Sequence, residues 1–310
     1  MRWNMKILVS GLMNIETTLK IEQFPINYYP VGYPFFGIKS DVSGVAYNVA
    51  KALLSLENQI QLTSFIGSDE EGKRIRSRLE GENIGNQYIY EELRETPVTV
   101  ALYDNEGKRQ IHCDLKDIQE KTIDFPKIES AVMASDLVVL CNINFNRSLL
   151  KQVKEAGKLI ASDVHVISDI NDEYNQDFMK YADILFFSDE QLPCEPSEFL
   201  GKMKDTYSAK IMVIGLGKEG ALMYERAQNK MYRLGAAQVG EVVNTIGAGD
   251  ALFSAFINYY LKGYPAVEAL KRAEIFAALK IRHNGAAVGF CGEDVVEEYY
   301  QKYKVEVCEL

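Results

Sequence analysis

The sequence predicts an α/β protein with a doubly wound, three-layer α/β/α core, and three observations support this. Short apolar runs alternate with longer segments of helical periodicity along most of the chain. The central apolar runs are continuous rather than alternating, which is typical of parallel strands covered on both faces. The chain has 310 residues, 47% of them hydrophobic, and we expect residues 1–310 to form a single domain.

The elements of this core follow one another as strand and helix. Ser68 and Glu71 are spaced as a capping box, which predicts that a helix begins directly after the second strand. The expected strands cover residues 7–9, 60–66, 137–141, 159–162, 184–187 and 211–214, and the expected helices cover 45–56, 69–80, 147–156, a segment before 180, and 251–257.

Two stretches break the alternation of strand and helix. Residues 17–41 and 98–115 alternate polar and apolar side chains, as half-exposed strands do, and the second contains the turn Asp104-Asn105-Glu106-Gly107. We therefore expect a small accessory β-layer, formed by about residues 12–42 and 88–118, inserted into the main domain.

The composition excludes several classes of protein. The chain carries 34 Lys and Arg against 44 Asp and Glu, a formal net charge of −10, which argues against nucleic acid or an anionic membrane as partner. The sequence contains no apolar run of membrane-spanning length and no signal peptide pattern. Five scattered cysteines without a C-x-x-C pair predict reduced thiols and a cytoplasmic protein, and three histidines make a His-rich zinc site improbable.

The most informative segment runs from Asn244 to Asp250 and leads directly into the apolar residues 251–257. That apolar run is too long for a strand and ends near Gly263, so it predicts a buried helix. Gly247, Ala248 and Gly249 allow backbone N–H groups to approach a ligand, and the start of a helix favours an anion. Asp250 beside such a site could accept a proton from a hydroxyl that attacks a phosphorus atom.

A structural explanation of the same segment is also open. The two glycines shape a tight turn in this explanation, and Asp250 stabilises the first turn of the helix, because Gly-x-Gly-Asp turns are common.

Five ordered segments together resemble the ribokinase-like sugar kinases, the PfkB carbohydrate kinase family. The segments are Gly11 to Glu16, the string 41–50 with Gly44 and Asn48, residues 60–72, residues 211–220, and the string around Asp250. The resemblance covers nearly the whole chain.

This resemblance implies a ribokinase-like core with a β-lid over the acceptor, ATP and Mg²⁺ as cofactors, and a small sugar or nucleoside as the phosphate acceptor. Asp250 would be the general base, and the amides of Gly247, Ala248 and Gly249 would stabilise the transferred phosphoryl group. The other implied site residues are Asn14, Glu16, Gly44 and Asn48 for the acceptor, and Thr245, Gly215, Gly217, Lys218 and Gly220 for the nucleotide.

Several positions depart from the family pattern. Asn244 stands where the family has Asp, which removes a charge near the monovalent-cation site of many relatives and puts potassium activation in doubt. Ser188 and Gln191 replace both ends of the Asn-x-x-Glu motif that helps to organise magnesium, so no metal ligand is assigned. Val45 stands where ribokinase has a sugar-contacting Lys, which makes a close ribokinase improbable.

Two other functions and one oligomeric state are also considered. The same fold could act as a non-catalytic sugar or nucleotide sensor with a degenerate magnesium motif at Ser188 and Gln191. Residues 215–220 fit the G-x-G-x-x-G fingerprint of dehydrogenases, although the hairpin pattern after them argues against one. The exposed edges expected for lid strands suggest a homodimer through the lid.

Overall fold

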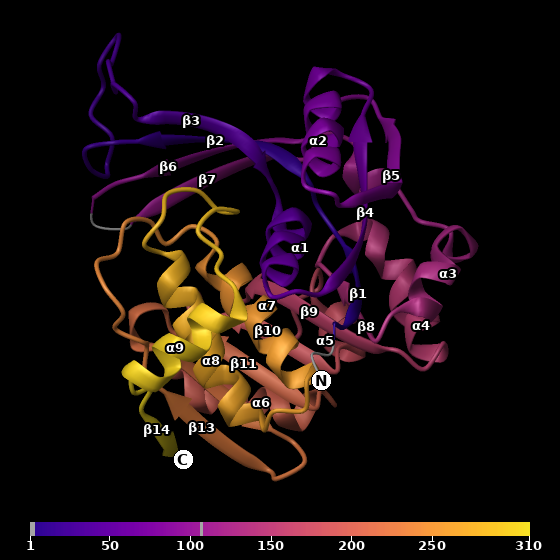
Figure 1. Ribbon diagram of the computed structural model, residues 1–310, viewed down its shortest axis with the longest axis vertical. Coiled ribbons are helices and arrows are strands. Elements are labelled where there is room, and N and C mark those ends of the chain that lie inside the picture. The colour runs from indigo at the N-terminus through magenta and orange to yellow at the C-terminus, as the bar shows by residue number, and fades with distance from the viewer. Residues whose placement is uncertain (1–3, 106–107) are drawn as a thin grey trace.

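The continuous apolar runs form the centre of a ten-stranded sheet in a computed structural model, which describes residues 4–105 and 108–310 (Figure 1). The strand order is β14-β13-β12-β11-β10-β9-β8-β1-β4-β5. Strands β11 to β5 in this order are parallel, and β12, β13 and β14 extend the other edge antiparallel. The bounds are β1 (Lys6–Ser10), β4 (Gln59–Gly67), β5 (Gly85–Leu93), β8 (Leu137–Leu140), β9 (Leu159–Val166), β10 (Ile184–Ser188), β11 (Ile211–Gly215), β12 (Ala221–Glu225), β13 (Lys230–Leu234) and β14 (Val307–Glu309).

Successive side chains of the central strands enter two separate cores. Ile7 and Val9 of β1 lie in one buried cluster and Leu8 in the other. One face of the sheet is covered by α1, α2, α7, α8 and α9, and the other by α3, α4, α5 and α6. This arrangement confirms the predicted doubly wound, three-layer fold. The helices are α1 (Val45–Ser55), α2 (Glu70–Gly81), α3 (Phe125–Ala134), α4 (Arg147–Glu155), α5 (Gln176–Tyr181), α6 (Pro196–Thr206), α7 (Ala248–Leu261), α8 (Ala266–Lys280) and α9 (Glu293–Lys302), with 3-10 turns η1 (Ile118–Glu120), η2 (Asn144–Asn146) and η3 (Gly217–Glu219).

A second, smaller sheet lies over one end of the core, and we call it the lid sheet. It consists of β2 (Asn14–Lys20), β3 (Ile38–Ser43), β6 (Val98–Tyr103) and β7 (Arg109–Asp114), in the order β3-β2-β6-β7. Figure 1 shows it projecting beyond the helices of the core. The expectation of a small accessory β-layer is therefore confirmed.

The expected bounds of the lid were wrong at one place. Residues 88–93 belong to β5, which pairs parallel with β4 in the large sheet. The physical reason is that both faces of this strand are covered, since Ile89 lies in one core and Tyr90 packs against the other. Of the turn at 104–107, residues 106–107 lie outside the described part of the chain.

The capping box expected at Ser68 and Glu71 is also corrected. The N-cap of α2 is Asp69, whose Oδ1 accepts a hydrogen bond of 2.9 Å from the amide of Gly72. Its Oδ2 accepts 2.7 Å from the amide of Thr96. Asp69 therefore satisfies one amide of the helix and one of a neighbouring loop, each with a different carboxylate oxygen.

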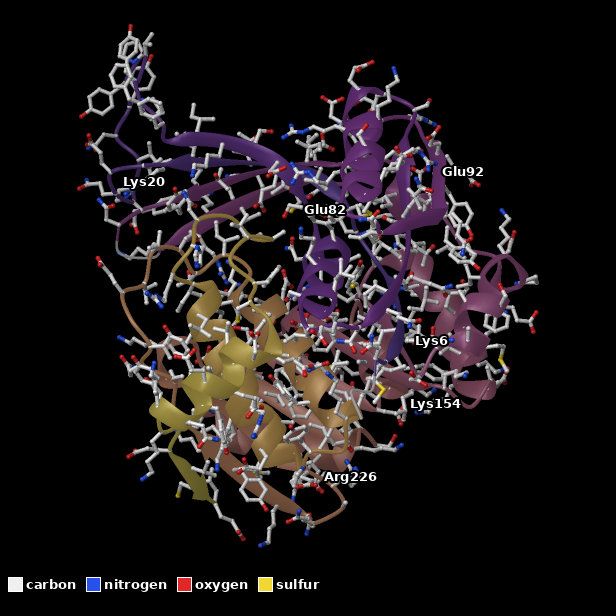
Figure 2. The ribbon with its side chains drawn as sticks, viewed as in Figure 1. Lys6, Lys20, Glu82, Glu92, Lys154 and Arg226 are labelled. Atoms are coloured by element: carbon white, nitrogen blue, oxygen red, sulfur yellow. The ribbon has the colours of Figure 1, made fainter. Side chains whose placement is uncertain are left out.

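The segment 21–37 between β2 and β3 contains no helix or strand and exposes its aromatic side chains. Tyr28 is 88% exposed, Phe35 84% and Phe36 99%, and Figure 2 shows side chains at this outer tip of the lid sheet, away from the core. None of the described helices has the length and apolar character needed to cross a membrane.

Candidate active site

Asp250 lies in the first turn of α7, and a glycine loop precedes it. The N-cap residue Gly247 has a φ of 78°, and a Cβ there would lie 2.5 Å from the carbonyl oxygen of Ala286. Only glycine meets both conditions. A Cβ on Gly249 would meet nothing within 4 Å. Open space thus faces the start of α7, where unpaired amides and the helix dipole attract an anion.

Hydrogen bonds within residues 244–250 fix this loop from inside. The amide of Ala248 donates to the carbonyl oxygen of Thr245 at 3.1 Å. The amide of Ile246 donates to Oδ1 of Asn244 at 2.8 Å. Because the Ala248 amide is used within the turn, the amides of Gly247 and Gly249 are the better candidates for an anion.

Asn48 connects Asp250 to the other end of the sequence. Its Nδ2 donates a hydrogen bond of 2.8 Å to Oδ2 of Asp250, although the two residues are 202 positions apart. The Asn48 Oδ1 accepts from the hydroxyl of Ser43 at 3.3 Å. The structure therefore brings together two of the five segments that carry the resemblance, and Asn48 fixes the orientation of the carboxylate.

Gly44, at the start of α1, contributes a close backbone approach. It has a φ of 101°, and a Cβ there would lie 2.5 Å from the carbonyl oxygen of Leu12. The same oxygen accepts from the amide of Ala46 at 3.1 Å. Gly44 thus lets the loop after β1 lie against the start of α1, which positions Asn48 one turn later.

Charged groups from β9 and α8 act on the Asp250 carboxyl. Burial raises its pKa, and the nearby carboxylate of Asp163 raises it further, whereas His165, the bond from Asn48 and the Lys280 ammonium lower it. Asp163 and His165 both lie in β9, which extends beyond the expected end at residue 162. A carboxylate with a raised pKa is a stronger proton acceptor, as a general base requires.

The predicted acceptor residues Asn14 and Glu16 lie on β2 of the lid sheet. Nδ2 of Asn14 donates to the hydroxyl of Thr99 at 2.5 Å, while its buried Oδ1 has no partner among the described residues. Burial raises the pKa of Glu16, and the Asp250 carboxylate raises it further, which places Glu16 close to the candidate base. The unpaired oxygen of Asn14 suits a hydroxyl donor from a ligand.

Four of the five predicted nucleotide residues, all except Thr245, lie at or directly after the carboxyl end of β11. Gly215 ends this strand, and its carbonyl oxygen accepts from the amide of Asp189 at 3.2 Å. Gly217 and Lys218 belong to the turn η3, where Lys218 is exposed. Position 220 requires glycine for packing alone, because a Cβ there would lie 2.1 Å from the carbonyl oxygen of Leu234.

Asn244 forms a bridge that its amide group makes possible. Its Nδ2 donates a hydrogen bond of 2.9 Å to Oδ1 of Asn284. The Nδ2 of Asn284 in turn donates a hydrogen bond of 3.1 Å to the hydroxyl of Tyr103 in the lid sheet. Aspartate at position 244 would lack this donor. Asn244 in place of the family's Asp therefore removes a charge and also connects the loop before α7 to the lid sheet through hydrogen bonds.

The described residues do not fit a resident metal ion. They contain no group of three His, Cys, Asp or Glu side chains that could hold one. Ser188 Oγ accepts from the amide of Glu190 at 3.3 Å, and Glu190 pairs with Arg109 at 3.0 Å. Magnesium, which prefers phosphate and water oxygens around one or two carboxylates, would reach this site as part of MgATP.

Sequence reasoning missed two basic residues of the site. Lys280 ends α8 and is fully buried, and Arg109 lies on β7 within range of its charge. Lys280 follows the buried Ala278 and Leu279 of an alanine-rich helix. Its position at the end of this apolar stripe was the one feature of the sequence that indicated burial. A lone lysine at a helix end is usually solvated, which hides that signal.

Comparisons with known proteins show the family of this chain. A sequence model of the pfkB family carbohydrate kinases matches residues 4–290. A 5-dehydro-2-deoxygluconokinase of Clostridium perfringens is 25% identical over 300 residues, covering 87% of this chain and 86% of that protein.

Solved structures show the same fold. A microbiome-derived acarbose kinase superposes with a TM-score of 0.87 and 22% identity, covering 96% of this chain and 100% of the other. The ribokinase of Arabidopsis thaliana in complex with ribose and ATP gives a TM-score of 0.79 and 19% identity, covering 96% and 99%. With the match over residues 4–290, the chain belongs to the pfkB family of carbohydrate kinases and is a sugar kinase.

Proposed function

We propose that the chain transfers the γ-phosphoryl group of ATP to a hydroxyl of a small sugar, with Asp250 as general base. The hydrogen bond of 2.8 Å from Asn48 to Asp250 carries this proposal. It holds one carboxylate oxygen and leaves Oδ1 of Asp250, directly after the glycine loop, to accept a proton.

The transfer is an in-line displacement at phosphorus. Asp250 takes the proton of the acceptor hydroxyl, the hydroxyl oxygen forms a bond to the γ-phosphorus, and the bond to the bridging oxygen of ADP breaks. The amides of Gly247 and Gly249 face the charge that develops on the phosphoryl oxygens. The products are the phosphorylated acceptor, ADP and a proton, which leaves Asp250 after the transfer.

The lid side of the site favours a polyhydroxylated acceptor over a nucleoside. The unpaired Oδ1 of Asn14 and the carboxylate of Glu16 are hydrogen-bond acceptors suited to sugar hydroxyls. Aromatic side chains able to stack on a base are found in segment 21–37 of the lid sheet, but there they are exposed, with Tyr28 at 88%. The relatives named above for 5-dehydro-2-deoxygluconate, acarbose and ribose support a sugar as the substrate class.

The sensor hypothesis has one observation in its favour. The described residues hold no cluster of metal-binding side chains, and Ser188 and Gln191 replace the motif that organises magnesium in the family. A sensor would bind sugar or nucleotide and release no ADP, so one assay separates the two functions.

The test is ADP release from MgATP against a panel of hexoses, pentoses, sugar phosphates and nucleosides, with Asp250→Asn in parallel. We expect at least one sugar to give turnover, which Asp250→Asn lowers about 10³-fold because a positioned base contributes 10²–10⁴-fold. Asp294→Asn is the matched control, since Asp294 is an acid in the first turn of α9. No ADP release from the wild type, with sugar binding still seen by thermal shift, would establish the sensor instead.

We propose two further properties. The scattered cysteines favour a cytoplasmic setting. The edge strand β3 carries Ile38, 57% exposed, and favours a homodimer through the lid sheet. Light scattering at micromolar concentration tests the dimer, and a monomer mass would contradict it.

A further inference from the structure

Lys280 is a buried charged residue next to the glycine loop. It is the last residue of α8, its side chain is 0% exposed, and its Nζ donates a hydrogen bond to the carbonyl oxygen of Ile246. A buried ammonium has a large desolvation cost unless nearby groups compensate for it. Burial lowers the pKa of Lys280 to about 8, while the carboxylates of Asp250 and Glu16 oppose that shift.

The carbonyl of Ile246 belongs to the same peptide unit as the amide of Gly247. Gly247 is the N-cap of α7, and among the described residues its N–H has no main-chain or side-chain acceptor. A cation on the carbonyl oxygen of a peptide polarises the unit and makes its N–H a stronger donor. The Lys280 ammonium therefore acts through one peptide unit on an amide proposed to bind the phosphoryl group.

The charges around Lys280 come from three elements. Asp250 on α7 and Glu16 on β2 attract its ammonium, and Arg109 on β7 repels it. The same ammonium lowers the pKa of Asp250 and of Glu16. It therefore also keeps the proposed base in the ionised form that accepts a proton.

We propose that Lys280 is a positioning residue for phosphoryl transfer, a fixed cation built into the chain directly behind the glycine loop. This inference rests on the proposed function. It assigns to Lys280 a role that packing does not require, because Met has a similar length and would fill the same space without a charge.

The first experiment compares Lys280→Met with Lys271→Met, which removes a lysine from the same helix. Lys271 pairs with Glu268 at 2.7 Å and is not among the groups that shift the pKa of Asp250 or of Glu16. We expect Lys280→Met to lower kcat at least tenfold with the KM for the acceptor within about twofold, and Lys271→Met to leave both within about twofold. A folded Lys280→Met protein with wild-type kcat would overturn the proposal.

Chemical rescue separates charge from packing. Lys280→Ala leaves room beside the Ile246 carbonyl, so ammonium or methylammonium chloride should restore several-fold of its kcat, and tetramethylammonium chloride at equal ionic strength should not. Equal kcat in all three salts would contradict a role of the charge.

Wild-type protein provides a measurement that does not depend on a variant folding. As the pH rises past about 8, the ammonium loses its proton, so kcat/KM for MgATP should fall. A profile that stays flat to pH 10 would overturn the proposal.

Titration of both proteins with ATP separates this proposal from the proposed function. If the wild type releases no ADP with any acceptor, the proposed function fails. At least fivefold weaker ATP binding by Lys280→Met would then still support the built-in cation, and equal ATP binding would overturn it as well.

Discussion

The proposed acceptor side and the proposed nucleotide side of the site are built differently. On the acceptor side, side chains from distant segments bond one another: Asn48 holds Asp250, and Asn14 holds Thr99. On the nucleotide side, strand ends and glycine turns dominate, and the charged side chain of Lys218 is exposed. The acceptor side is therefore preorganised by side chains, whereas the nucleotide side offers mainly backbone groups.

After Asp250, the glycine loop between the two sides gives the largest expected effect. Gly247→Ala combines a φ of 78° with a contact of 2.5 Å to the Ala286 oxygen, so the loop must move. We expect a stability loss of about 1–3 kcal/mol and a loss of kcat of roughly 10²-fold, as for a lost oxyanion donor. Thermal melting and ADP release measure both.

Gly249→Ala is the matched substitution. Its Cβ meets nothing within 4 Å, and alanine is more favourable than glycine in a helix by about 1 kcal/mol. We expect unchanged or higher stability and a clear loss of activity, because the methyl group would occupy the space proposed for the phosphoryl group. Full activity of Gly249→Ala would show that the phosphoryl group does not bind next to Gly249.

Asn14 gives the next largest effect and tests the preorganised side. Asn14→Leu removes the unpaired oxygen and the bond to Thr99, and we expect the KM for the sugar to rise about tenfold, the equivalent of one hydrogen bond of about 1.4 kcal/mol. Thr99→Val removes the same bond but leaves that oxygen in place, so its KM should change less. Steady-state kinetics that show equal KM changes for the two variants would mean that Asn14 does not contact the acceptor.

A residue of this site could be predicted from the sequence where its neighbours in the chain form a recognisable motif with it. The start of α7 was predictable because the glycines, Asp250 and the apolar run are contiguous. The Asn48–Asp250 bond spans 202 positions, so only the family resemblance connected its ends.

The errors have local causes. The lid bounds failed at β5 because alternation cannot show that both faces of an edge strand are covered. Lys280 was missed because periodicity shows only which face of a helix a residue occupies. The hydrogen-bond partner of its ammonium, the carbonyl oxygen of Ile246, lies in a loop 34 positions earlier in the chain.

Gln191 gives a smaller effect, in the opposite direction. It is exposed in the segment after β10, beside Asp189, whose pKa is raised by burial. Gln191→Glu restores the family's carboxylate, and we expect the magnesium concentration for half-maximal rate to fall about threefold, since one more carboxylate favours MgATP. Gln176→Glu, on the exposed face of α5, is the control. An unchanged magnesium titration would show that position 191 does not face the metal.

Lys218 gives the smallest expected effect and tests the nucleotide side of the comparison most directly. Its side chain is exposed in η3, and its neighbour Glu219 pairs with Arg233 instead. A flexible, solvated ammonium contributes little to binding compared with fixed amides, so Lys218→Ala should raise the KM for MgATP by no more than about two- to threefold, with kcat unchanged. A tenfold rise in that KM would break the comparison, because the nucleotide would then depend on a charged side chain that becomes ordered when ATP binds. Initial rates over a range of MgATP at two ionic strengths decide between these outcomes, since only a contact through charge weakens as salt is added.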